Sequence, residues 1–265
     1  MSENQEKALA LVMVTVFLIS AYFLAKGFAM YTGENEKTDF EDNRSVFAET
    51  FEEETDAGEK SREKTAGNSK FCVVVDAGHG GKDPGKVGVD DVLEKDINLQ
   101  IAGLLKKFLE MDDVTVVMTR ETDAGLYDEN SSNKKVQDMK RRIEIIEEAG
   151  PDLVVSIHQN SYQDSSVKGG QVFYYTTGEK SRQLAQIMQN QLREIDPLNK
   201  REAKGNTNYY LLKKTTVPTI IVECGFLTNP EEARMLADPA YQERMAFEIH
   251  MGIMKYLNGL REGDS

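Results

Sequence analysis

Cysteine and histidine are scarce in this chain of 265 residues, which contains two of the first and three of the second. Two cysteines are too few for a disulfide framework or a cysteine zinc site, so we expect Cys72 and Cys224 to be buried free thiols in strands. Basic residues are also fewer than acidic ones, with 32 Lys and Arg against 45 Asp and Glu, and they form no basic cluster. A protein that tracks nucleic-acid phosphates normally presents a basic patch, so we expect no nucleic-acid partner.

One long apolar run lies near the N-terminus. Residues 8–25 read ALALVMVTVFLISAYFLA and contain no charge. This length approaches the roughly 20 residues that cross a bilayer and exceeds the roughly 7–15 of a signal-peptide core, and no clear small-x-small cleavage site follows. We therefore predict that residues 1–30 form a cytoplasmic N-terminus and an uncleaved, single-pass transmembrane anchor. A cleaved signal peptide is the alternative, and the flanking charges do not settle the orientation.

The next segment, residues 31–69, is acidic, polar and without apolar periodicity. Such a composition buries too little apolar surface to offset the entropy cost of ordering the chain, so we predict a flexible, disordered linker. Residues 70–265 form the remaining, folded part, where apolar runs and helical periodicities alternate.

The folded part is predicted to be a single α/β domain with a mixed, mostly parallel sheet covered by helices on both faces. Continuous apolar runs predict strands, and apolar residues at helical spacing predict helices. The predicted strands are 71–76, 114–119, 153–158, 171–175 and 219–223, and the predicted helices are 96–110, 134–149, 179–195 and 240–257.

Three of these predicted strands end on, or just before, side chains of the kinds that do chemistry. The stretch CVVVDAGH contains His79, LVVSIHQN contains His158 and TIIVECGF contains Glu223. Glu94 lies at the start of the first predicted helix. Functional groups of such sheets gather beyond the carboxyl ends of the strands. Two imidazoles and a carboxylate suffice to hold a catalytic zinc ion, and a further carboxylate can accept a proton from water. These residues alone indicate no more than a possible metal hydrolase, and His250 is expected to have a packing or surface role.

The stretch DAGHGGKDPGK also matches the first seven positions of a phosphate-binding P-loop. However, Val87 stands where that loop needs Ser or Thr, and Pro84 lacks a backbone N–H. The chain also continues through VGVDDVL before a helix begins. We therefore expect no nucleotide here, and we interpret the glycines as shaping the loop around His79.

Several motifs together carry a family resemblance that extends from about Phe71 to Leu257. They are VVVDAGHGGKDPGKVG with LEKDINL, VVMTRETD, LVVSIHQNS, NYYLLKKTTVPTIIVECGFLTNPEEARML and YQERMAFEIHMGIMKYL. The chain resembles the zinc-dependent N-acetylmuramoyl-L-alanine amidases of bacterial cell walls. The resemblance implies that His79, Glu94 and His158 bind Zn²⁺, that Glu223 is the catalytic base, and that residues 70–265 are the zinc amidase domain. The substrate would be peptidoglycan, cut between N-acetylmuramic acid and the L-alanine of the stem peptide.

The layout of anchor, linker and one catalytic domain looks most like the short, membrane-anchored spore-cortex type, which prepares muramic δ-lactam sites. The resemblance places the catalytic domain on the outer, cell-wall side of the membrane and allows a protein activator. Three residues are weaker substrate-binding candidates: Asn160 as a groove residue, and Arg120 and Arg141 as residues that shape the site or bind stem-peptide carboxylates. A structural ion-pair role for both arginines is equally compatible with the sequence. Ala77 and Gln159 depart from the family's commoner residues, and neither removes a ligand.

Two alternative functions remain open at this point. A zinc peptidase that cuts within the stem peptide would share every motif. An inactive cell-wall-binding protein belongs to another class, and the loss of Glu223 or of a ligand would be its signature. All four positions are filled in this chain.

Overall fold

The computed structural model describes residues 71–263, so the predicted anchor and linker lie outside the described residues. The strands are β1 (Cys72–Ala77), β2 (Thr115–Met118), β3 (Leu153–Asn160), β4 (Gln171–Tyr175), β5 (Lys204–Asn206) and β6 (Thr219–Phe226). The helices are η1 (Val89–Asp91, 3-10), α3 (Glu94–Met111), α4 (Lys134–Ala149), α5 (Glu179–Ile195), α6 (Tyr210–Lys214), α7 (Pro230–Ala237) and α8 (Pro239–Gly263). None of the helices in this range has both the length and the apolar character needed to span a bilayer.

The strands form one mixed sheet in the order β2-β1-β3-β6-β4-β5. Strands β2, β1, β3 and β6 are mutually parallel, β4 runs antiparallel to β6, and β5 is parallel to β4. The predicted mixed, mostly parallel sheet is therefore confirmed. Because β1, β3 and β6 are adjacent and parallel, the segments that follow them emerge at one edge of the sheet.

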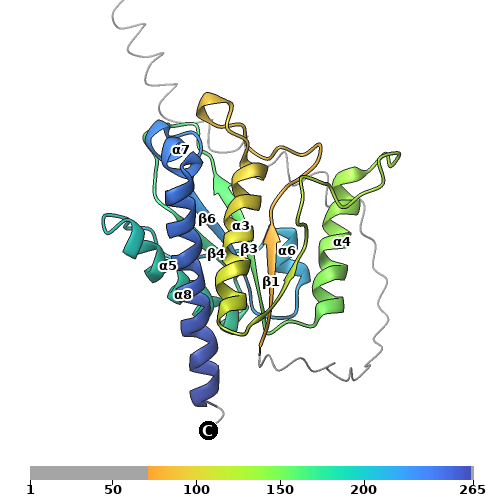
Figure 1. Ribbon diagram of the computed structural model, residues 1–265, viewed down its shortest axis with the longest axis vertical. Helices are drawn as coiled ribbons and strands as arrows, with labels where there is room; N and C mark the ends of the chain where they lie inside the picture. Colours follow the sequence, from red (N-terminus) through yellow and green to blue (C-terminus); the bar gives the residue numbers. More distant parts are fainter. Residues whose placement is uncertain (1–70, 264–265) are drawn as a thin grey trace, which may run out of the picture. The chain divides into compact units, whose positions relative to one another are not determined.

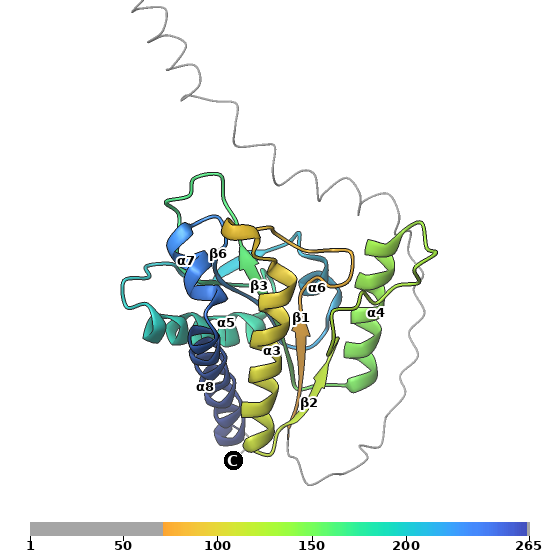
Figure 2. The same ribbon diagram turned by 45° about the horizontal axis from the view of Figure 1, so that its top comes forward.

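Helices cover both faces of this sheet, as predicted. Figures 1 and 2 show α3, α5 and α8 on one side, with α4 and α6 on the other. Alternate residues of β1 supply the two cores: Val73 and Val75 join the large cluster with α3 and α8, whereas Val74 packs with Ile146 of α4 and Leu211 of α6. This burial on both faces is why the central strands are almost continuously apolar in sequence.

Most predicted helices and strands are present, but the sequence pattern did not predict all of their end residues. Helices α4 and α5 begin and end at the predicted residues, and α8 is longer than predicted at both ends. Strands β3 and β6 continue beyond His158 and Glu223, because they pair with each other as far as Asn160 and Phe226, with a register shift between His158 and Asn160. His158 and Glu223 therefore lie within strands and not at their ends. The short elements β5, α6 and α7 were not predicted.

Candidate metal centre

The loop after β1 holds His79 in a left-handed backbone conformation, with φ of 61°. This conformation costs a residue with a Cβ about 1 kcal/mol or more. Two buried arginines hold the loop in place through its carbonyl oxygens. Arg142 donates to the carbonyl of His79 at 2.8 Å, and Arg120 donates to those of Ala77 at 2.9 Å and Gly78 at 3.0 Å.

The structure brings together His79 from the loop after β1, Glu94 from the start of α3 and His158 from β3. One ligand atom from each lies within 4.8 Å of the other two. Nε2 of His79 is 3.2 Å from Glu94 Oε1, and Nδ1 of His158 is 3.0 Å from the same oxygen. The other ring nitrogen of His79, Nδ1, pairs with Asp83 Oδ2 at 2.8 Å. Both imidazoles therefore present a nitrogen to one carboxylate.

The electrostatics of this cluster favour a positive charge at its centre. Burial raises the pKa of Glu94, but hydrogen bonds from His158 and His79 outweigh burial and hold that pKa well below its usual range. Burial lowers the pKa of His79, but the carboxylates of Asp83 and Glu94 outweigh it and raise that pKa to about 10. A proton or a metal cation can supply the positive charge that these carboxylates stabilise. Two imidazole nitrogens and one carboxylate oxygen fit Zn²⁺, which commonly takes three such ligands in catalytic sites.

Glu223 lies beside the cluster on β6. It is the register partner of His158 on the parallel strand β3, so both side chains lie on the same face of the sheet. Glu223 is buried, with 7% of the residue exposed, and its Oε2 has no hydrogen-bond partner among the described residues. Burial, with a contribution from Glu94, raises the pKa of Glu223 to about 7. A carboxyl group with this pKa can both accept and return a proton near neutral pH.

Tyr209 is a neighbour of Glu223 that the sequence analysis missed. Its hydroxyl lies close enough to the Glu223 carboxylate to lower the pKa of that group, and its ring packs edge-on against Phe173 at 5.5 Å. Burial, followed by the charges of Glu223 and Glu94, raises the pKa of Tyr209 far above its usual value, so the hydroxyl stays protonated. Nothing local in the sequence marks this residue, because it precedes a five-residue helix and reaches Glu223 only through the fold.

The three weaker candidates have different surroundings. Asn160 ends β3, and its Oδ1 accepts a hydrogen bond from the next backbone N–H, so its place in a substrate groove stays a prediction. Arg120 is 4% exposed and, within residues 71–263, donates only to backbone carbonyls, which supports the alternative that it shapes the site. Arg141 does not join the cluster, because its guanidinium pairs with Glu144 and Glu148 on its own helix. The alternative prediction for Arg141, a structural ion-pair role, therefore accounts for these contacts.

A buried ion pair beneath the site was also missed. Asp76 of β1 is 1% exposed and accepts hydrogen bonds from Arg142 of α4, from Thr119 and from Ser156. Burial raises the pKa of Asp76, but Arg142 and the two hydroxyl groups outweigh burial and lower that pKa to about 2. The sequence shows a carboxylate at the end of an apolar strand, but it does not show which of the many charged residues of α4 is the partner.

The surroundings of the two cysteines and of the third histidine, His250, largely match the predictions. Cys72 and Cys224 lie in strands and neither forms a disulfide, as expected, although Cys72 is only partly buried. His250 is buried on α8 between Phe108 and Phe247, and its Nε2 lies 2.7 Å from Asp112 Oδ2. Its predicted packing role is confirmed.

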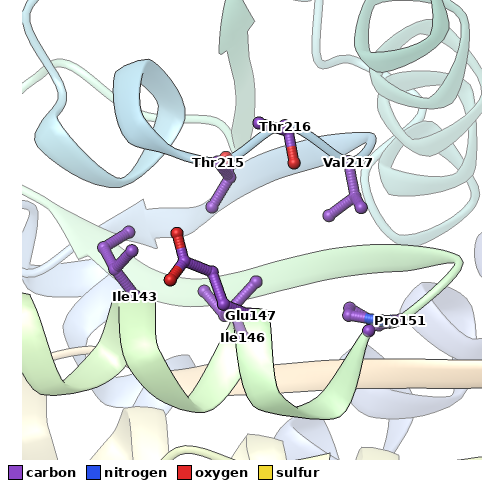
Figure 3. Close-up of a pocket in the computed structure, with 8 residues that line it drawn as sticks. Ile143, Ile146, Glu147, Pro151, Thr215, Thr216 and Val217 are labelled. Atoms are coloured by element: carbon purple, nitrogen blue, oxygen red, sulfur yellow. The ribbon is translucent and has the colours of Figure 1, made fainter. Parts of the chain in front are cut away.

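A separate pocket of about 180 Å³ lies between α4 and the segment that precedes β6. Figure 3 shows Ile143, Ile146 and Glu147 of α4 on one side and Thr215 and Val217 on the other. None of the predicted site residues lines it. This pocket is therefore distinct from the histidine–glutamate cluster.

Comparisons with known proteins agree with the geometry of the site. The sequence profile of the N-acetylmuramoyl-L-alanine amidases matches residues 73–255. The germination-specific N-acetylmuramoyl-L-alanine amidase of Bacillus subtilis is 36% identical over 187 residues, which cover 69% of this chain and 78% of that protein.

Comparison with solved structures also finds N-acetylmuramoyl-L-alanine amidases. The CwlD amidase of Clostridioides difficile, solved in complex with the GerS lipoprotein, is 39% identical, with a TM-score of 0.69 over 71% of this chain and 98% of that one. The amidase AmiC2 of Nostoc punctiforme is 35% identical, with a TM-score of 0.64 over 72% of this chain and 99% of that one. The match over most of the described domain confirms the resemblance seen in the motifs. This chain belongs to the N-acetylmuramoyl-L-alanine amidase family.

Proposed function

We propose that this amidase is zinc-dependent, with His79, Glu94 and His158 as the metal ligands and Glu223 as the catalytic base. The observation that carries the proposal is the meeting of three donor atoms within 4.8 Å beside a buried carboxyl with a pKa of about 7. Zinc, when bound, would polarise the scissile carbonyl and lower the pKa of a water molecule. The substrate is the amide between N-acetylmuramic acid and the L-alanine of the stem peptide.

The residues of the chain supply the proton transfers and the alignment. Ionised Glu223 accepts at Oε2 the proton of the water whose oxygen adds to the carbonyl carbon. Protonated Glu223 then gives that proton to the alanine nitrogen as the C–N bond breaks, which leaves a lactyl carboxylate on the sugar and a free peptide amine. Tyr209 stays protonated and orients the carboxylate by donating to it. Asp83 holds the proton of His79 on Nδ1, so that the lone pair of Nε2 faces the cluster.

The biological setting is proposed from the relatives. The similarity to a germination-specific amidase and to CwlD supports a role in the spore cortex, where removal of stem peptides precedes muramic δ-lactam formation. CwlD was solved with a lipoprotein, which supports a protein partner for this chain as well. Residues 8–25 would anchor the enzyme, with the catalytic domain on the cell-wall side of the membrane.

Digestion of purified sacculi and cortex by the full-length protein, followed by mass spectrometry, tests the reaction. Intact stem peptides with a free N-terminal alanine are expected, whereas cleaved stems would show the peptidase alternative instead. Zinc content is measured in the same preparations. Glu223→Gln should retain zinc and lose hydrolysis, and His79→Ala should lose both. Hydrolysis by Glu223→Gln at the wild-type rate would refute the assignment of the base, and zinc-loaded wild-type protein that binds sacculi without cutting them would support the inactive wall-binding alternative.

A further inference from the structure

The side chain of Asn98 connects the segments that carry all three proposed ligands. Asn98 lies one turn after Glu94 on α3 and is 0% exposed. Its Nδ2 donates to the carbonyl oxygen of Gly78 at 3.1 Å and lies 3.4 Å from Glu94 Oε1. Its Oδ1 accepts a hydrogen bond from Nε2 of Gln159 at 3.1 Å. One buried amide group thus reaches the β1 loop, α3 and β3.

The chemistry of these partners allows only one orientation of the Asn98 amide. The Gly78 carbonyl and the Glu94 carboxylate can only accept hydrogen bonds, so the NH₂ group of Asn98 must face them. The carbonyl oxygen of Asn98 then faces Gln159, which must present its own NH₂ group. Each hydrogen bond in this series fixes the orientation of the next amide group, so neither the Asn98 nor the Gln159 amide can exchange its donor for its acceptor.

The bonds end next to the ligands themselves. Gly78 immediately precedes His79, and Gln159 immediately follows His158. The backbone N–H of Gln159 also donates to Glu94 Oε1 at 3.1 Å. Asn98 and Glu94 therefore link the His79 loop to the His158 strand through side chains, in addition to the backbone pairing of β1 with β3.

We propose that Asn98 is a positioning residue that holds the His79 loop and the His158 strand at the separation required for metal binding. The proposal rests on the zinc function proposed above. Without the amide, the Gln159 NH₂ group would lose its buried partner and the Gly78 carbonyl would keep only the Arg120 guanidinium as a donor, at a cost in free energy. Movement of either segment, or entry of water, would relieve that cost and would separate the ligand nitrogens.

Asn98→Leu in the full-length protein tests the proposal, with Gln242→Leu as the matched control. Gln242 is 3% exposed on α8, and its Nε2 donates to Gln100 and to the Leu236 carbonyl, away from the ligand segments. Zinc affinity is measured by competition with a chromophoric chelator, and ligand geometry by the visible absorption of the Co²⁺-substituted protein. Thermal unfolding is measured in EDTA to report stability without metal.

We expect Asn98→Leu to weaken zinc binding about 10- to 100-fold and to change the Co²⁺ spectrum. Gln242→Leu should retain both properties at a comparable loss of metal-free stability. Equal zinc affinity and an unchanged spectrum in Asn98→Leu would overturn the proposal. If Asn98→Leu fails to fold, Gln159→Leu removes the other end of the link and carries the same expectation. Failure of the wild-type protein to bind zinc would refute the proposed function itself, a result that the variants cannot produce.

Discussion

The imidazole ring of His158 lies directly against the backbone of Gly78. A Cβ atom at Gly78 would lie 2.3 Å from both Cε1 and Nε2 of that ring, far inside van der Waals contact. The backbone N–H of Gly78 also donates to the carbonyl of Ile157 at 3.1 Å, so the loop runs close alongside β3. Glycine is needed here because the ring occupies the space of a side chain, which leaves Nδ1 facing Glu94.

Gly78→Ala should therefore displace His158 and disrupt the metal centre. We expect zinc affinity to fall at least about tenfold and hydrolysis to fall in proportion, because one of three ligands is moved. Chelator competition and digestion of sacculi measure the two effects. Gly103→Ala is the control, because a Cβ there meets nothing within 4 Å and lies in helix α3, where alanine is the better helix former. Zinc binding by Gly78→Ala equal to that of Gly103→Ala would contradict this account.

Burial of the Glu223 carboxylate should destabilise the metal-free protein at high pH. Its folded-state pKa of about 7 is above the unfolded value of 4.5, so the folded state binds the proton more tightly between these values. The penalty is therefore absent below about pH 4.5, grows as pH rises, and is complete above pH 7, at about 3 kcal/mol. Glu223→Gln should raise the melting temperature in EDTA at pH 8 and change it little at pH 4.5. A variant less stable than wild type at pH 8 would contradict the prediction.

Arg142 and its neighbour Arg141 provide a matched pair of substitutions on α4. Arg142→Met leaves Asp76 buried without its cation, and we expect a loss of about 3–5 kcal/mol at pH 7 in urea unfolding. Arg141 is exposed, so Arg141→Met should change stability by less than about 1 kcal/mol.

The cost of Arg142→Met should also depend on pH. The folded-state pKa of Asp76 is about 2, below its unfolded value of 3.8, so its stabilisation is present above 3.8 and is lost as pH falls through 2. The difference between wild type and Arg142→Met should narrow across that range. Equal losses in the two arginine variants at pH 7 would refute the assignment.

Tyr209→Phe removes the hydroxyl that donates to Glu223 and preserves the ring that packs on Phe173. The hydroxyl lowers the pKa of Glu223, so its removal should raise that pKa and move the acidic limb of the kcat/KM profile to higher pH. Zinc affinity should change little, because Tyr209 belongs to no ligand segment. Tyr175→Phe, at an aromatic position of β4, is a control for the loss of a hydroxyl. A profile identical to wild type would show that Tyr209 does not act on the base.

Local sequence was sufficient for the framework of the site. Apolar runs and helical spacing predicted the α/β sheet, because strands buried on both faces must be apolar. The positions of His79, Glu94, His158 and Glu223 near strand and helix ends identified the residues with suitable chemistry. The exact strand ends were not predictable, because β3 and β6 extend each other by pairing.

The partners of these residues depend on the order and register of the strands, which no local pattern contains. Asp76 meets Arg142 across 66 residues, and Asn98 meets Gln159 across 61. The sequence by itself was sufficient to predict the family and the fold class, and it supplied the four residues that we propose carry the chemistry. Only the tertiary structure decided which buried polar groups hold them, because a polar group in the interior must be paired and its partner is set by packing.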